Sequence, residues 1–185
     1  MKRLKHHGFI TTVLIGMLIL SIILPLIFVS YVVDGESMEP TLHDGNMLMV
    51  NKVAYDLKKV DRFDVVVFHK SEKEDYVKRV IGLPGDEIEY KNDKLYINGE
   101  FIEEKYLETY KQKQNHNDSL YTENFKLQEV TGKQEVPENS LFVMGDNRTN
   151  SLDSRSFGFV TIDKLVGKVD VKYWPFEKNV LVSLP

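Results

Sequence analysis

The sequence contains no cysteine in its 185 residues. This absence excludes a disulfide framework and any metal site with thiolate ligands. Histidine is scarce as well, with five residues in the chain. The best ligand cluster, His43 with Asp44 and Asn46, has too few donors for a convincing metal site. We therefore expect neither a metal ion nor another cofactor.

Two glycine patterns are also missing. No phosphate-binding or dinucleotide-binding pattern occurs, and Gly82-Leu83-Pro84-Gly85 is typical of a turn. The Gly-x-Ser-x-Gly motif that presents a nucleophilic serine in many hydrolases is absent, because Met38-Glu39 follows Ser37. The first absence argues against nucleotide binding. The second weakens the interpretation that the chain is a Ser-His-Asp hydrolase.

Basic charge is in short supply outside the N-terminus. The chain has 28 acidic and 24 basic residues and a net charge of −4, and Lys2, Arg3 and Lys5 account for three of those basic residues. The remainder is therefore more acidic than the net charge suggests. Nucleic-acid binding depends on neutralising phosphates, so we do not expect nucleic acid as a partner.

Charge is absent altogether between Gly8 and Val33, a run of 26 residues. A helix needs roughly 20 apolar residues to cross a bilayer, whereas a signal peptide has an apolar stretch of about 7–15 residues and a small-residue cleavage site. A buried soluble helix is the alternative, but residues 13–24 are apolar on every side. We predict a transmembrane anchor over 9–28. The basic tail 1–8 would stay in the cytoplasm, and residues 29–185 would form an extracytoplasmic domain at the cell membrane.

The rest of the chain predicts mostly antiparallel β structure. Asn98-Gly99 is a strong hairpin signal, because both positions tolerate positive φ. One helical turn is plausible at 162–165, and the polar stretch of about 103–138 suggests a mobile insertion or small cap. The expected strands are 30–33, 47–50, 62–69, 76–82, 86–90, 94–97, 100–102, 141–144, 166–174 and 180–182.

Ser37 follows the anchor so closely that it must lie near the membrane. Nine extended residues after position 28 reach at most ~30 Å. A serine hydroxyl needs a neutral base before it can attack a carbonyl. His43 and His69 are candidates, although each is more commonly a turn or strand-end residue. Lysine is the other known base for serine.

Lys78 lies in an apolar strand that could bury its amine. Lowering a lysine pKa from ~10.4 to ~8 disfavours the charged form by about 3 kcal/mol, which desolvation can supply. Strand alternation places Lys78 on one face with Tyr76 and Val80, and Arg79 on the other. The alternative is an exposed Lys78 with Arg79 facing a partner.

A third polar cluster follows the predicted strand 141–144. Asp146, Arg148, Asp153 and Arg155 could form ion pairs that fix a loop, and Ser151 could orient the lysine amine. A solvated turn is the alternative for the same composition.

Taken together, these motifs resemble those of the bacterial type I signal peptidases, single-span membrane endopeptidases that use serine and lysine. The resemblance covers nearly the whole chain. It rests on the anchor and on four ordered motifs: Ser37-Met38-x-Pro40-Thr41-Leu42, Arg62-x-Asp64-Val65-Val66-Val67-Phe68, Tyr76-Val77-Lys78-Arg79-Val80-Ile81-Gly82-x-Pro84-Gly85-Asp86 and Gly145-Asp146-Asn147-Arg148-x-Asn150-Ser151-x-Asp153-Ser154-Arg155.

The resemblance implies a coiled β-sheet catalytic core and removal of signal peptides from exported precursors after Ala-x-Ala-type sequences. It implies Ser37 as nucleophile, Lys78 as general base and Ser151 as the hydroxyl that holds the amine. Asp146, Arg148, Asp153 and Arg155 would be structural supports. The substrate-binding residues would be Val33, Gly35, Met38, Leu42, Tyr76 and Val77.

Three further points stay open in the sequence. Some members of the family carry a serine two residues before the nucleophile as an oxyanion donor, whereas this chain has Gly35. Trp174 and Phe176 could be interfacial anchors or core residues. A non-catalytic anchored domain that binds exported chains, or a self-cleaving repressor-type protein, are competing hypotheses; the presence of both Ser37 and Lys78 disfavours the first, and the anchor disfavours the second.

Overall fold

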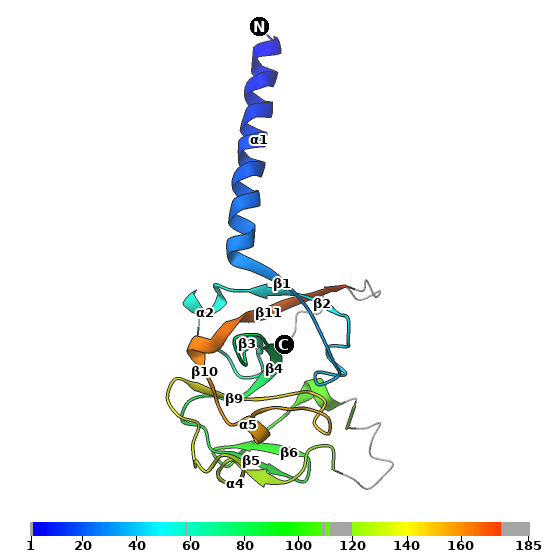
Figure 1. Ribbon diagram of the computed structural model, residues 1–185, viewed down its shortest axis with the longest axis vertical. Coiled ribbons are helices and arrows are strands. Elements are labelled where there is room, and N and C mark those ends of the chain that lie inside the picture. The colour runs from blue at the N-terminus through cyan, green and yellow to red at the C-terminus, as the bar shows by residue number, and fades with distance from the viewer. Residues whose placement is uncertain (1, 58, 109, 112–119, 175–185) are drawn as a thin grey trace.

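The computed structural model describes residues 2–57, 59–108, 110–111 and 120–174. The strand expected at 180–182 and the residue Phe176 lie outside these ranges. Within them the chain forms one long N-terminal helix, α1, followed by a β domain (Figure 1).

Helix α1 covers Lys2–Ile27, and its apolar part is Phe9–Ile27, with a mean hydropathy of 2.7. It is long and apolar enough to cross a membrane, and the side chains of that part are exposed in the structure. The helix ends where aromatic and β-branched residues begin, because such residues favour strands. Phe28 therefore opens strand β1 (Phe28–Val32), so the helix ends one residue before the expected end of the anchor at position 28.

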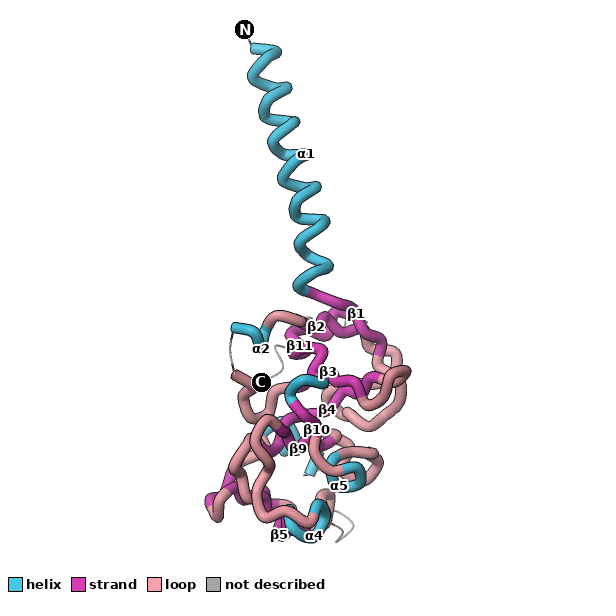
Figure 2. The backbone as a smooth tube through the Cα atoms, turned by 60° about the vertical axis from the view of Figure 1, so that its left-hand side comes forward, coloured by secondary structure: helices cyan, strands magenta, loops and turns pink. Residues whose placement is uncertain are grey.

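The larger sheet has seven strands in the order β1-β2-β11-β3-β4-β9-β10, and all its pairings are antiparallel. Strands β1, β2 and β11 lie next to the end of α1, and β9 lies farther from it (Figure 2). The bounds after β1 are β2 (Met47–Asn51), β3 (Val65–His69), β4 (Asp75–Gly82), β9 (Ser140–Met144), β10 (Val160–Thr161) and β11 (Leu165–Trp174).

The smaller sheet has four antiparallel strands in the order β7-β6-β5-β8 and lies at the end of the domain remote from α1 (Figure 1). These are β5 (Ile88–Lys91), β6 (Lys94–Ile97), β7 (Glu100–Ile102) and β8 (Phe125–Lys126). The hairpin predicted at Asn98-Gly99 is confirmed, with φ of 52° and 81° at the two residues. The mostly antiparallel β fold predicted from the sequence is therefore correct.

The expectation that 103–138 contributes no core residues is wrong for the described part of this segment. This segment contains the short helix η1 (Lys105–Leu107), strand β8 and helix α4 (Leu127–Thr131). It buries the side chains of Leu107, Tyr121, Phe125, Leu127 and Val136. The apolar residues are widely spaced among polar ones and follow no helical or strand period. The polar composition therefore did not reveal that these residues belong to the core.

Short elements complete the fold. The turn expected at 162–165 is the helix η2 (Ile162–Lys164), whereas α2 (Ala54–Leu57) and α5 (Ser154–Phe157) were not expected. Asp153 caps the N-terminus of helix α5, and its carboxylate accepts a hydrogen bond from the Arg155 N–H. With this N-cap, Ser154 Oγ accepts a hydrogen bond from the Val143 N–H of strand β9, and Asp153 accepts one from the Gly145 N–H just after it.

Strand β4 runs through the middle of the packed interior. Its residue Val77 packs with Val65 and Val67, whereas Tyr76 and Val80 pack with Val66. Each fully buried valine or leucine contributes about 1.5–3 kcal/mol relative to exposure. These two clusters together hold β4, and hence Lys78, in a fixed position.

Candidate active site

Ser37 and Lys78 lie in direct contact although 41 residues separate them. Lys78 Nζ is 2.6 Å from Ser37 Oγ and 3.0 Å from the Val77 carbonyl oxygen. Ser37 lies in the loop between β1 and β2, whereas Lys78 lies in β4, so only the folded sheet brings them together. The distance is within the reach needed for proton transfer between a nucleophile and its base.

The Lys78 side chain is buried, with 4% of its surface exposed. Burial lowers the pKa of its ammonium group to about 8, while the negative charges of Asp153 and Asp146 act in the opposite direction. The alternative of an exposed lysine is therefore wrong. A substantial fraction of the amine is neutral near pH 8, which is the form that can accept a proton.

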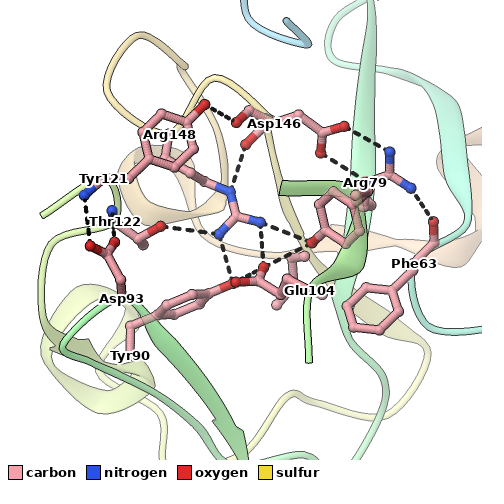
Figure 3. Close-up of polar contacts among 12 residues, drawn as sticks. Phe63, Arg79, Tyr90, Asp93, Glu104, Tyr121, Thr122, Asp146 and Arg148 are labelled. Atoms are coloured by element: carbon pink, nitrogen blue, oxygen red, sulfur yellow. Dashed lines mark hydrogen bonds and ion pairs between the residues drawn. The ribbon is translucent and has the colours of Figure 1, made fainter. Parts of the chain in front are cut away.

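Arg79, the neighbour of Lys78, is fully buried and binds Asp146 with two nitrogens. The Nε and Nη2 atoms donate to the carboxylate at 2.9 and 2.7 Å (Figure 3). The Thr41 hydroxyl donates to the same carboxylate, so this ion pair also ties down the loop that carries Ser37. Bidentate arginine–carboxylate pairs are strong and directional.

Arg148 makes a second buried ion pair, with Glu104, at 2.5 Å between Nη2 and Oε1. The hydroxyl groups of Tyr90 and Tyr106 also donate to Glu104 Oε1 at 2.7 and 2.8 Å (Figure 3). Burial opposes ionisation, but Arg148 lowers the pKa of Glu104 to about 2. The loop after β9 is thereby joined to the smaller sheet.

The expectation that the four charged residues of this loop pair among themselves is correct only for Asp153 and Arg155. Arg155 Nη2 donates to Asp153 at 2.8 Å, and Asp153 also accepts from the Gly145 N–H at 3.0 Å. Burial disfavours the ionised carboxyl, yet Arg155 holds the Asp153 pKa below its usual value. Asp146 and Arg148 instead pair with Arg79 and Glu104, which lie on other elements. No local pattern signals these distant partners.

The loop after β9 presses against the backbone of Ser37. The Asn147 N–H donates to the Ser37 carbonyl oxygen at 3.1 Å, and a Cβ added at Gly145 would meet that oxygen at 2.3 Å. Only glycine permits this approach. The same added Cβ would meet Ser151 Oγ at 2.2 Å, so Ser151 lies in the same tight space.

Ser151 Oγ is buried and makes no hydrogen bond with any described residue. The hydrogen bond between Ser151 and the Lys78 amine that the resemblance implies is thus not formed in this structure. Its hydroxyl lies close enough to Asp153 to favour the ionised carboxylate.

A cleft of about 470 Å³ opens beside the Ser37–Lys78 pair. Of the expected substrate-binding residues, Val33, Gly35, Tyr76 and Val77 line it. Met38 and Leu42 do not: they are fully buried and pack beneath the lining, because the loop after Ser37 turns inward. The sequence did not identify the other lining residues, which are Tyr31, Val32, Asp34, Leu48, Val67, Lys73, Glu74, Asp75 and Leu152.

Gly35 has a φ of 92°, a conformation that side chains rarely adopt. Its N–H donates to Asp44 Oδ1 at 2.8 Å, so this N–H is already engaged. By contrast, no backbone hydrogen bond from the Ser37 N–H is formed within the described residues. Of the two N–H groups, the Ser37 N–H is therefore the one not engaged in a backbone hydrogen bond.

The fold and the site define a class of hydrolase in which a buried amine stands beside a serine hydroxyl. Comparison with known proteins agrees with that class. Residues 6–174 match the family model described as signal peptidase, peptidase S26. The chain belongs to this family, and it is a serine peptidase that hydrolyses peptide bonds.

Individual relatives are similar over most of their length. The chain is 59% identical to signal peptidase I of Bacillus caldolyticus over 152 residues, which is 82% of each protein. It is 42% identical to signal peptidase IB of Staphylococcus aureus strain COL, over 91% of this chain and 90% of that protein. The crystal structure of a signal peptidase I from Enterococcus faecalis V583 superposes with a TM-score of 0.57 at 42% identity, covering 60% of this chain and 97% of that one.

Proposed function

We propose that the chain is a membrane-anchored endopeptidase that removes signal peptides from exported precursors by means of a Ser37–Lys78 dyad. The observation that carries the proposal is the 2.6 Å contact between a buried amine and a serine hydroxyl at the edge of the cleft. Family membership supports the substrate class.

The dyad would work through an acyl-enzyme. Neutral Lys78 takes the proton from Ser37 Oγ as that oxygen attacks the carbonyl carbon of the scissile peptide bond. The resulting oxyanion accepts from the Ser37 N–H, and the lysine gives its proton to the departing amine. A water molecule, deprotonated by the same lysine, then hydrolyses the ester and restores Ser37.

The charged residues near the dyad would act as supports rather than reactants. Asp146 and Asp153 hold the loop that presses on Ser37 through their pairs with Arg79 and Arg155. Arg148 joins the same loop to the smaller sheet through Glu104. Ser151, whose hydroxyl is buried and makes no hydrogen bond with a described residue, would orient the amine of Lys78.

We assign the apolar part of α1, Phe9–Ile27, as a single bilayer span, with the basic segment 1–8 in the cytoplasm and the β domain outside. Its apolar length and exposed side chains support this assignment. The cleft is lined by Val33 and Val77 over the buried Leu48 and Val67, which leaves room for small residues such as the alanines of an Ala-x-Ala sequence. Precursors and lipid are thus the expected partners, and nucleic acid is not.

The test uses the full chain in detergent with a radiolabelled precursor. Ser37→Ala and Lys78→Ala should each lower kcat/KM by about a thousandfold or more, because neither group works alone. The exposed residues Ser71 and Lys133 supply matched controls, and Ser71→Ala and Lys133→Ala should cleave at the parental rate. Cleavage by either dyad variant at a comparable rate would refute the mechanism.

A further inference from the structure

One peptide group connects the loop after β9 to the backbone around Ser37. It joins Asp146 to Asn147, and its N–H donates to the Ser37 carbonyl oxygen at 3.1 Å. The Asn147 side chain adds a second bond, from Nδ2 to the Glu36 carbonyl oxygen at 3.2 Å. These two carbonyl oxygens belong to the peptide groups on either side of the Ser37 Cα atom. The orientation of the Ser37 N–H, and of the bond that carries its hydroxyl, therefore depends on where Asn147 lies.

The other end of the same peptide group is held by Tyr121. The Tyr121 hydroxyl donates to the Asp146 carbonyl oxygen at 2.6 Å, and this bond is buried (Figure 3). The Arg148 N–H also donates to that oxygen, at 3.0 Å. A hydrogen bond to a carbonyl oxygen polarises the peptide group and strengthens its N–H as a donor. Tyr121 therefore orients this group and strengthens its bond to the Ser37 carbonyl oxygen.

The backbone of Tyr121 is fixed by the turn between β5 and β6. Asn92 and Asp93 form this turn with φ of 52° and 61°, as in tight two-residue hairpins. The Asp93 carboxylate oxygens accept from the Tyr121 and Thr122 N–H groups at 3.0 and 2.6 Å (Figure 3). The Asn92 N–H donates to Asn124 Oδ1 at 2.7 Å. A hairpin of the smaller sheet thus sets the position of the tyrosine.

The Tyr121 hydroxyl is a permanent donor that lies away from the substrate. The side chain is buried, and burial raises the pKa of the hydroxyl to about 12, so it keeps its proton at the pH of any cleavage assay. Tyr121 does not line the cleft, so it does not touch a peptide bound there. Its hydroxyl therefore reaches Ser37 only through the Asp146–Asn147 peptide group.

We propose that Tyr121 is a positioning residue for the nucleophile, because its hydroxyl orients the peptide group that holds the backbone on both sides of Ser37. The proposal rests on the Ser37–Lys78 mechanism proposed above and deepens it. Loss of the hydroxyl leaves the cleft and Lys78 in place but lets Ser37 move away from the geometry of attack. The segment 103–138 then contributes to the rate of the chemical step as well as to the core.

The test measures single-turnover cleavage of a synthetic peptide by an excess of the full chain in detergent. Tyr121→Phe removes the hydroxyl and keeps the ring. The rate constant at saturating protein should fall about tenfold, because a small misplacement of a reacting group slows the chemical step. The protein concentration that gives half the maximal rate should stay within about twofold, since the cleft is unchanged. A loss of stability alone would leave this rate constant at the parental value, because unfolded molecules do not bind the peptide.

Two further variants supply a control and a second probe. Tyr110 packs against Tyr121 with 5.9 Å between the ring centroids. Tyr110→Phe is therefore the matched control and should cleave at the parental rate. Asp93→Asn leaves an acceptor for one of the two N–H groups, so the rate constant should fall about threefold. If Tyr121→Phe does not fold, the rate constant of Asp93→Asn decides: a parental value would overturn the proposal.

The pH profile separates positioning from an electrostatic effect. In Tyr121→Phe the inflection near pH 8 should not move, because the hydroxyl acts on Ser37 and not on the Lys78 amine. A shifted inflection would assign the loss to a changed field of Asp146 at Lys78 and would overturn the proposal. A parental rate constant, or a loss seen only in the half-saturating concentration, would overturn it too. A parental chain that cleaves no peptide would instead reject the proposed function, and the role of Tyr121 with it.

Discussion

Burial and charge act on the Lys78 amine in opposite directions. Desolvation favours the neutral amine, while Asp153 and Asp146 favour the charged one. Each of those carboxylates is itself paired with an arginine, so its field at Lys78 is reduced. Desolvation therefore prevails, and the pKa falls to about 8.

The rate of peptide cleavage should follow the ionisation of this amine. Because the neutral form is the base, kcat/KM should rise from pH 6 with an inflection near pH 8 and level off above it. The measurement is steady-state cleavage of one peptide between pH 6 and 10, in a buffer series of constant ionic strength. A profile that stays flat over that range would contradict a lysine base.

At the scale of elements, the junction between α1 and the β domain sets the direction of the helix relative to the cleft. The Lys52 N–H donates to the Ile27 carbonyl oxygen at 2.8 Å, and Lys52 Nζ donates to the Pro25 carbonyl oxygen at 3.0 Å. The last carbonyl groups of a helix lack partners within the helix. Lys52, which follows β2, donates hydrogen bonds to two of these carbonyl groups and so fixes the direction in which α1 leaves the sheet.

Substitution of Lys52 should separate two kinds of substrate. Lys52→Met keeps the backbone bond and loses the side-chain bond, whose net value is about 1 kcal/mol. Cleavage of a precursor inserted in lipid vesicles should fall roughly fivefold, because the anchor direction is less restricted. Cleavage of a soluble peptide should not change.

The control for this experiment is Lys133→Met, which replaces an exposed lysine next to α4, at the end of the domain remote from α1 (Figure 1). Equal losses on the soluble and the inserted substrate in Lys52→Met would show a defect in the domain itself. No loss on either substrate would show that the side-chain bond has no part in presentation.

At the scale of the whole molecule, the smaller sheet is joined to the loop after β9 by a buried ion pair. Glu104 follows β7, and its carboxylate forms an ion pair with Arg148. Arg148 belongs to the loop that also donates a backbone hydrogen bond to Ser37. The two sheets share an apolar cluster that includes Ile81 of β4, Tyr90 of β5 and Phe142 of β9. The buried Glu104–Arg148 pair lies at this boundary and joins the sheets electrostatically.

The Glu104 pKa predicts how stability depends on pH. A shift from 4.5 to about 2 corresponds to about 3 kcal/mol of stability that is present above pH 4.5 and lost as the pH falls toward 2. Glu104→Gln should therefore lower the free energy of unfolding by about 3 kcal/mol at pH 7, and by much less at pH 2.

Denaturant unfolding of the detergent-solubilised protein at both pH values checks this expectation. The neighbouring Glu103 is exposed over 59% of its side chain, so Glu103→Gln is the matched control and should have little effect. A Glu104→Gln variant as stable as the parent at pH 7 would mean that the ion pair adds nothing beyond an amide in its place.

The sequence by itself determined the features that depend on local chemistry. An uncharged run longer than a bilayer span predicted a helix, since a helix satisfies its own backbone groups in an apolar environment. Period-two patterns and the Asn98-Gly99 turn predicted most of the strands, and spaced motifs singled out Ser37 and Lys78 as candidates.

Only the tertiary structure decided which distant side chains meet. Glu104 became the partner of Arg148, Asp75 the partner of Tyr31, and Met38 and Leu42 turned into the core rather than the cleft. The physical reason is that an ion pair or a cleft wall depends on how strands pair across the sheets. Strand pairing depends on packing over the whole domain. The residues that flank each partner in the sequence therefore do not indicate which distant residue it will contact.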